Sequence, residues 1–156
     1  MIDADEAASA ARQALAALSG PSHEAAIAAA ASGEAGWPLF VTRMDRPDQS
    51  YYLVPWHDEQ GIVLVVQIDA DDGAMRSFAL LPAPVGQLLI SKEQAVRLVA
   101  ECRIQVTGDA ELVWKPSRES TSPLQPLWRV PVEGGERFVT AGGEVRDRLT
   151  DLGRGG

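Results

Sequence analysis

The feature that most constrains this chain is an order of structural signals that occurs twice along it. A helix signal, strand signals, a tight turn and a final strand run through residues 1–81, and the same order returns over residues 90–150. Three pairs of segments match between the two copies: 2–7 with 90–95, 51–56 with 127–132, and 68–75 with 138–145. One copy buries little apolar surface by itself, so we expect the two to pack together.

Helix and strand signals are visible within each copy. Asp3 followed by Glu6, and Ser91 followed by Gln94, have the spacing of a capping box at a helix N-terminus. Runs of β-branched and aromatic residues between turn residues predict strands. The predicted helices span 3–18, 22–32 and about 91–102. The predicted strands span 38–44, 51–56, 62–68, 74–80, 111–114, 127–132, 137–140 and 144–149.

These signals predict an α+β fold of two repeated units, each a helix packed on a small antiparallel β-sheet. The first unit spans 1–81 and contains an additional alanine-rich helix near 22–32. A Pro- and Gly-containing linker over 82–89 leads to the second unit, 90–150. Residues 151–156 form a predicted disordered tail.

One motif resembles a known family. Residues 68–75 read hydrophobe-Asp-x-x-polar-Gly-x-hydrophobe after an acid-capped helix and an aromatic strand, and this pattern resembles the PepSY domain. In the second copy, residues 138–145 lack the aspartate, so the match rests on the helix, Trp128 and Gly143. The resemblance implies two tandem copies of a propeptide-type module, the second degenerate. It also implies a protein that inhibits or chaperones peptidases, with no catalytic residues to carry over.

Composition and charge exclude several classes of protein. The chain has 14 basic and 22 acidic side chains, a net charge of −8, which argues against nucleic acid as the main partner. One cysteine forms no internal disulfide, and two histidines with one cysteine cannot build a Cys/His zinc site. No apolar run approaches the roughly 18 residues that span a bilayer, so we predict no membrane insertion.

Candidate catalytic and metal motifs are incomplete. His23 and Glu24 begin like a zincin helix, but Ile27 stands where the second histidine is required. Three aspartates at positions 69, 71 and 72 could bind calcium, yet their spacing differs from an EF-hand and suits a hydrogen-bonded turn. We predict no catalytic residue, no metal and no cofactor.

Two further groups have a structural and a chemical interpretation. His57, Asp58 and Glu59 form either an acid–base cluster or a solvated hairpin turn, and the turn is favoured because neighbouring turn residues point in different directions. Cys102 lies on the apolar stripe of the helix predicted over 91–102, which favours a small core residue over a nucleophile.

Aromatic residues carry the functional prediction. Six lie on or beside predicted strands: Trp37, Tyr51, Tyr52, Trp56, Trp114 and Trp128. Neighbours on a strand face opposite sides, so we expect Tyr51, Tyr52 or Trp56 to be exposed, where aromatic side chains often mark protein-binding surfaces. The alternative is that they fill the core beneath the helices. The candidate binding residues are Tyr51, Tyr52, Trp56 and Trp128.

The prediction is therefore a non-catalytic module that binds a protein or peptide and modulates that partner by inhibiting or chaperoning it. A sheet edge near Pro55 or Pro131 is expected to accept the partner as a strand. One alternative is a small-molecule-binding or enzymatic domain with a pocket between helix and sheet, favoured by a deep pocket containing His57 or Cys102. Another is an acidic assembly subunit that docks on a basic partner, because residues 1–78 hold twelve acidic but four basic side chains.

The N-terminal residues are acidic and lack the basic start of a secretory signal. A complete chain is therefore expected in the cytoplasm, and a chain from which a signal segment was trimmed is expected to be exported. The sequence specifies neither the partner's identity nor the oligomeric state.

Overall fold

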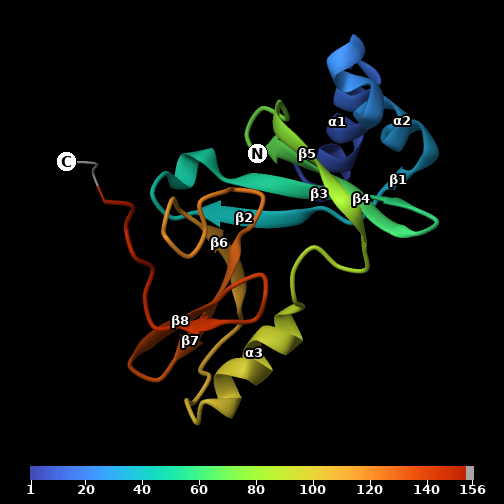
Figure 1. The fold of residues 1–156 in the computed structure, drawn as a ribbon. Coiled ribbons are helices and arrows are strands. Elements are labelled where there is room, and N and C mark those ends of the chain that lie inside the picture. Colours follow the sequence, from blue (N-terminus) through green and yellow to red (C-terminus); the bar gives the residue numbers. More distant parts are fainter. Residues whose placement is uncertain (154–156) are drawn as a thin grey trace. The chain divides into compact units, whose positions relative to one another are not determined.

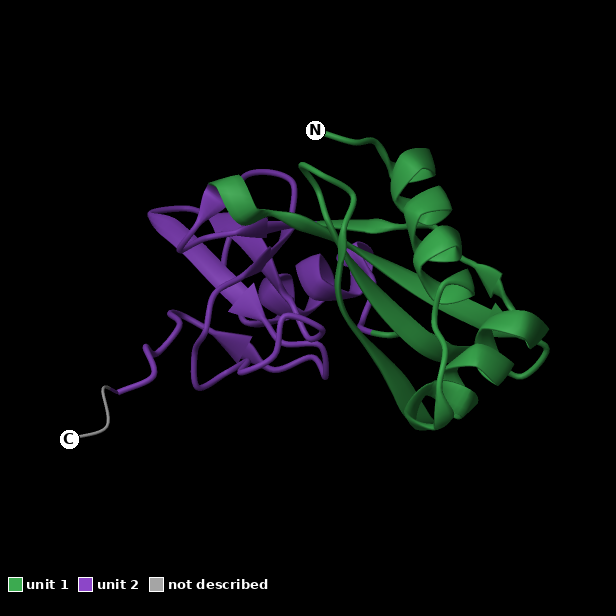
Figure 2. Cartoon of the chain, turned by 90° about the horizontal axis from the view of Figure 1, so that it is seen from above, with its two compact units in different colours: residues 1–40, 48–88 green, residues 41–47, 89–156 purple. Residues whose placement is uncertain are grey.

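The computed structural model describes residues 1–153 and forms two compact units (Figures 1 and 2). Unit 1 consists of residues 1–40 and 48–88, and unit 2 consists of residues 41–47 and the described residues from Leu89 on. Among the helices of residues 1–153, none has the length and hydrophobicity of a membrane-spanning segment.

Unit 1 is an antiparallel sheet with two helices on one face (Figure 1). Its strands are β1 (Glu34–Ala35), β3 (Tyr51–Asp58), β4 (Gly61–Asp69) and β5 (Met75–Val85). Its helices are α1 (Ala4–Ala16), the 3-10 turn η1 (Pro21–His23) and α2 (Glu24–Ser32). β4 pairs with β3 on one side and β5 on the other, and β1 adds to the far side of β3.

The predicted start of α1 is confirmed. Asp3 Oδ1 accepts from the Glu6 amide at 2.8 Å, and Glu6 Oε2 accepts from the Asp3 amide at 2.7 Å, so the capping box is complete. Ala7, Ala11 and Leu15 recur at helical spacing and bury one stripe of α1. This stripe packs on the helix-facing residues of β3 and β4 to form the core of unit 1.

In its described residues, unit 2 contains one α-helix and a mixed set of strands. Its elements are the last residues of β2 (Leu39–Arg43), α3 (Lys92–Glu101), β6 (Glu111–Trp114), β7 (Leu127–Val132), β8 (Gly135–Val139) and β9 (Val145–Arg146). β6 to β9 pair antiparallel, whereas β2 pairs parallel with β6 through Thr42–Val113 and Arg43–Trp114. The predicted capping box of Ser91 and Gln94 is confirmed at the start of α3.

The predicted fold class of two repeated units, each a helix on a small antiparallel sheet, is wrong. The strands follow one mixed nine-stranded hydrogen-bonded order, β5-β4-β3-β2-β6-β7-β8-β9, with β1 beside β3. The parallel pair of β2 and β6 is the cause, because it joins segments far apart in sequence. Local patterns identify such strands but carry no signal of a non-local partner.

Two segments differ from simple linkers or tails. β5 runs on to Val85 and so extends into the segment predicted as a linker over 82–89. Asp151 forms an isolated bridge with Ser117 and an ion pair of 3.0 Å with Lys115 Nζ. Residues 154–156 of the predicted disordered tail lie outside the described residues.

Candidate functional site

The four aromatic candidates are buried. The exposed fractions are 1% for Tyr51, 8% for Tyr52, 4% for Trp56 and 9% for Trp128, so the expected exposure of Tyr51, Tyr52 or Trp56 is wrong. Tyr52 and Trp56 belong to the core cluster beneath the helices, as the alternative interpretation had it. Trp128 lies in unit 2, so the structure does not gather the four into one surface.

Backbone carbonyl groups explain why these large side chains can be buried. The Tyr52 hydroxyl donates to the Ile2 carbonyl at 3.1 Å, and Trp56 Nε1 donates to the Ala30 carbonyl at 3.2 Å. Trp128 Nε1 donates to the Ile90 carbonyl at 2.7 Å. Each polar atom is therefore satisfied inside the protein, where an unsatisfied donor would be costly.

The backbone edges near the two strand prolines are occupied by the chain itself. The Gly36 amide donates to the Pro55 carbonyl at 2.7 Å, and the Thr107 amide donates to the Pro131 carbonyl at 2.9 Å. Both proline carbonyls are therefore already bonded to other segments of this chain. The prediction that a sheet edge near Pro55 or Pro131 accepts a partner strand is wrong. The sequence indicates a proline in a strand but not which segment lies beside it.

The outer edge of β5 is open within the described residues. β5 ends the strand order and pairs with β4 alone. Its regular ladder covers residues 77–80, which oppose residues 64–67, and register shifts interrupt the pairing on both sides. Phe78 packs against the core of unit 1, while Leu80 is 41% exposed. A short backbone window, with Phe78 and Leu80 on the same face of the sheet, is therefore available for strand pairing.

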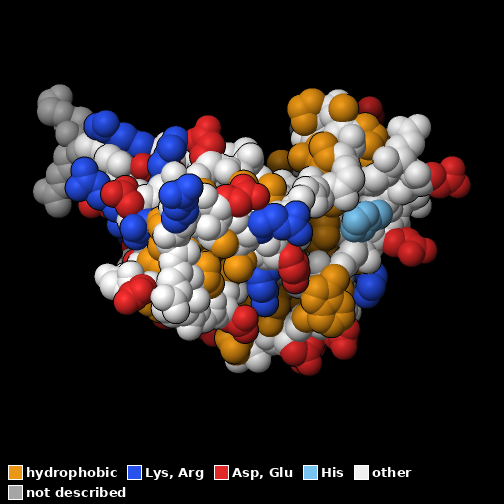
Figure 3. Space-filling view, turned by 90° about the horizontal axis from the view of Figure 1, so that it is seen from below, with side chains coloured by type: hydrophobic (Ala, Val, Ile, Leu, Met, Phe, Trp, Pro, Cys, Tyr) orange, Lys and Arg blue, Asp and Glu red, His pale blue; other side chains and the backbone are white. Residues whose placement is uncertain are grey.

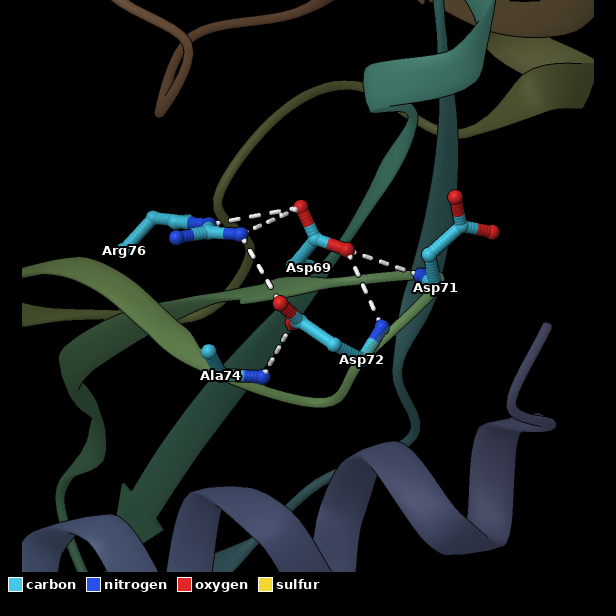
Figure 4. A network of polar contacts seen from close by, with 5 residues as sticks. All are labelled: Asp69, Asp71, Asp72, Ala74 and Arg76. Atoms are coloured by element: carbon cyan, nitrogen blue, oxygen red, sulfur yellow. Dashed lines mark hydrogen bonds and ion pairs between the residues drawn. The ribbon is translucent and has the colours of Figure 1, made fainter.

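An aspartate-rich turn fixes the start of β5 (Figure 4). Asp69 Oδ1 accepts from the Asp71 amide at 2.8 Å and from the Asp72 amide at 3.2 Å. Asp72 Oδ1 accepts from the Ala74 amide at 2.8 Å. Arg76 Nη2 lies 3.1 Å from both Asp69 Oδ2 and Asp72 Oδ2. Gly73 completes the turn at φ +73°, a conformation that glycine adopts without strain.

These contacts set the ionisation of the turn. Burial acts to raise the pKa of Asp69, but hydrogen bonds from the Asp71 and Asp72 amides and from Arg76 outweigh it, and the pKa lies below its ordinary value. The hydrogen bond and charge of Asp69 raise the pKa of Arg76 in return. The carboxylates thus hold the turn together, and no group of three or more metal-ligating side chains occurs in residues 1–153.

Asp71 is the exception in this turn. Its amide donates to Asp69, but its exposed carboxylate makes no hydrogen bond or ion pair within residues 1–153. Figure 4 shows this carboxylate pointing away from Arg76. The turn therefore presents one uncompensated negative charge at the start of the open β5 edge.

Unit 1 is strongly acidic as a whole. It contains eleven acidic side chains and two basic ones, Arg12 and Arg76, so its net charge is −9. Hydrophobic side chains are also exposed: Trp37 at 70%, Phe40 at 39%, Leu80 at 41% and Val85 at 37%. Figure 3 shows one face of the molecule, where hydrophobic, acidic and basic side chains lie interspersed. Sequence reasoning missed the exposure of Trp37, since exposure depends on which segments cover a residue.

The candidate nucleophile and acid–base groups do not form a catalytic arrangement. Cys102 is exposed at the C-terminal end of α3, so its predicted place in the core is wrong, and its Sγ contacts the Leu98 carbonyl at 3.4 Å. His57 is exposed at the end of β3. Asp58 accepts from the Gln60 amide at 2.7 Å, an arrangement typical of a solvated turn.

Comparison with known proteins finds no matching family model and no curated protein or solved structure with significant similarity to this chain. The resemblance to the PepSY domain stays a prediction.

Proposed function

We propose that this chain is a non-catalytic binding module that accepts a short, basic, extended segment of a partner protein along the outer edge of β5. The observation that carries this proposal is the open backbone edge of residues 77–80 in a unit of net charge −9. Holding a partner segment in extended form would inhibit or chaperone that partner, in keeping with the role that the PepSY resemblance implies.

Backbone geometry supports strand addition at this edge. Successive residues of a strand direct their amide and carbonyl groups to opposite sides, so about half of residues 77–80 offer theirs outward. A guest strand would satisfy these groups, and its alternate side chains would lie beside Phe78 and Leu80. The register shifts at both ends limit the paired guest to a few residues.

Charge supports a basic guest over a second copy of this chain. Two copies joined at β5 would bring two units of charge −9 together, and like charges oppose association. A lysine or arginine on the guest would instead meet the uncompensated carboxylate of Asp71. The expected binding weakens at high salt because the Asp71 carboxylate is exposed to solvent.

The test uses a peptide of three Lys-Val repeats that carries a fluorophore on its N-terminus and an amide at its C-terminus, and binding to the full chain is followed by fluorescence anisotropy. Its controls are the same peptide with Glu for Lys, and two versions N-methylated on alternate amides of one edge or the other. Amide exchange measured by NMR reports residues 77–80 directly. Strand addition predicts loss of binding for one N-methylated peptide and new protection confined to the outward amides of 77–80.

Matched variants separate strand addition from general attraction between a basic peptide and an acidic protein. Asp71→Asn is expected to weaken binding by roughly two- to fivefold, as for an exposed ion pair, whereas Glu59→Gln removes an equal charge at the other end of β4 and leaves affinity unchanged. Ala79→Pro and Leu80→Pro are both made, because one of two neighbours directs its amide outward. Proline at the outward-facing amide removes no hydrogen bond to β4, so that variant is expected to melt like wild type and to lose peptide binding. Equal binding of both N-methylated peptides, or no protection at 77–80, overturns the proposal.

A further inference from the structure

An apolar cleft lies between α1 and α2, above the sheet of unit 1. Its volume is about 280 Å³, and its lining includes Leu15, Ile27, Ala30, Ala31 and Trp56. The two helices lie side by side over the same face of the sheet (Figure 1). None of its lining residues belongs to β5, so the inference drawn from this cleft does not rest on the proposed function.

The sequence of α2 explains why this space is unfilled. Residues 24–32 contain one large apolar side chain, Ile27, among six alanines. Ala30 and Ala31 are too short to fill the space next to Leu15 and Trp56. Protein interiors are otherwise packed densely, and atoms lining an empty space lose dispersion contacts. An apolar ligand would restore those contacts.

One charged side chain, that of Arg12, lines this cleft. Arg12 lines the space from α1, is exposed, and forms no hydrogen bond or ion pair within residues 1–153. The residues one helical turn before and after it are Ala8, Ser9, Leu15 and Ala16, none of which is charged. Arg76, the other basic residue of unit 1, is paired with Asp69 and Asp72. Arg12 is therefore available to an anion from outside.

From this arrangement we infer that the cleft binds an aliphatic carboxylate, with the alkyl chain on Leu15, Ile27 and Trp56 and the carboxylate on the Arg12 guanidinium. A guanidinium matches a carboxylate through two parallel hydrogen bonds. The cleft of about 280 Å³ is open to solvent on one side, so it can take part of an alkyl chain while the carboxylate stays at Arg12.

Isothermal titration of the full chain with sodium decanoate below its micelle concentration tests the inference. Decanol and decyltrimethylammonium have the same alkyl chain with a neutral and a cationic head. Binding at one decanoate per chain, tighter than either comparison ligand, is expected. The NMR resonance of the Trp56 indole N–H, identified by its loss in Trp56→Phe, is expected to shift because this group donates to Ala30 beside the cleft.

Two variants of the cleft and one matched control complete the experiment. Arg12→Gln removes the cation and is expected to weaken decanoate binding roughly fivefold while leaving decanol binding unchanged. Ala31→Leu adds carbon atoms at an exposed position lining the cleft and is expected to abolish binding of all three ligands. Arg97→Gln is the control, an exposed arginine on α3 of unit 2. All variants are first checked to melt like wild type.

Three outcomes overturn the inference. The first is no decanoate binding by wild type. The second is binding of several decanoate molecules per chain without a shift of the Trp56 indole resonance. The third is equal binding by Arg12→Gln and wild type, which would remove the role of the cation.

Discussion

Arg76 Nη2 lies 3.1 Å from Asp69 Oδ2, so a guanidinium on β5 closes the turn that begins at the end of β4. Asp69 also accepts from two backbone amides and from Arg76 Nε, and its side chain is 13% exposed, so four N–H groups from three residues converge on one shielded carboxylate. The turn therefore depends on Asp69 in particular, although the sequence alone does not distinguish it from the aspartates at positions 71 and 72.

Asp69→Asn is expected to lower the free energy of unfolding at pH 7 by about 1–3 kcal/mol, because hydrogen bonds to a charged acceptor are lost. The folded-state pKa of Asp69 is depressed, so its stabilisation is present above the ordinary value of 3.8 and is lost as the pH falls through the folded pKa. Urea unfolding of both proteins across pH 2–7 measures this. The wild-type advantage should shrink below about pH 4, and an advantage that is constant down to pH 2 would contradict the assignment.

The sequence predicted the elements better than their arrangement. The capping boxes at Asp3 and Ser91 are local, and both formed as predicted, as did strands at 111–114 and 127–132. The partner of a strand is not local, so the parallel pair of β2 with β6 and the open edge of β5 had no signal. The buried aromatics had a period-2 pattern that places neighbours on opposite faces, but nothing in it shows that both faces are covered.

The tryptophans divide into buried and exposed residues that should behave differently. Trp56 is 4% exposed and donates to the Ala30 carbonyl, so Trp56→Ala is expected to lower the free energy of unfolding by about 3–5 kcal/mol. Trp37 is 70% exposed, so Trp37→Ala should change the free energy of unfolding by no more than about 0.5 kcal/mol. Urea denaturation followed by circular dichroism measures both variants. Equal losses for the two would show that Trp37 is covered in solution.

Cys102 provides a direct test of exposure. Its thiol is free and exposed at the end of α3, contrary to the core position that its helical stripe predicted. The native protein is expected to react with a chromogenic disulfide reagent at one thiol per chain, to the same extent as in denaturant. A native thiol that reacts only after unfolding would place the end of α3 against other residues.

Gly33 is required by close packing rather than by backbone conformation. Its φ of −130° suits any residue, but a Cβ there would lie 2.5 Å from the His57 carbonyl oxygen and 2.8 Å from Trp56 Cδ1. Gly33→Ala is therefore expected to lower the free energy of unfolding by about 1–3 kcal/mol. Gly86 has no atom within 4 Å of the same position, so Gly86→Ala should be neutral or stabilising by up to about 1 kcal/mol. Chemical denaturation measures both variants. If Gly33→Ala and Gly86→Ala change the free energy of unfolding equally, Gly33 does not pack as closely against His57 and Trp56 of β3 as the structure shows.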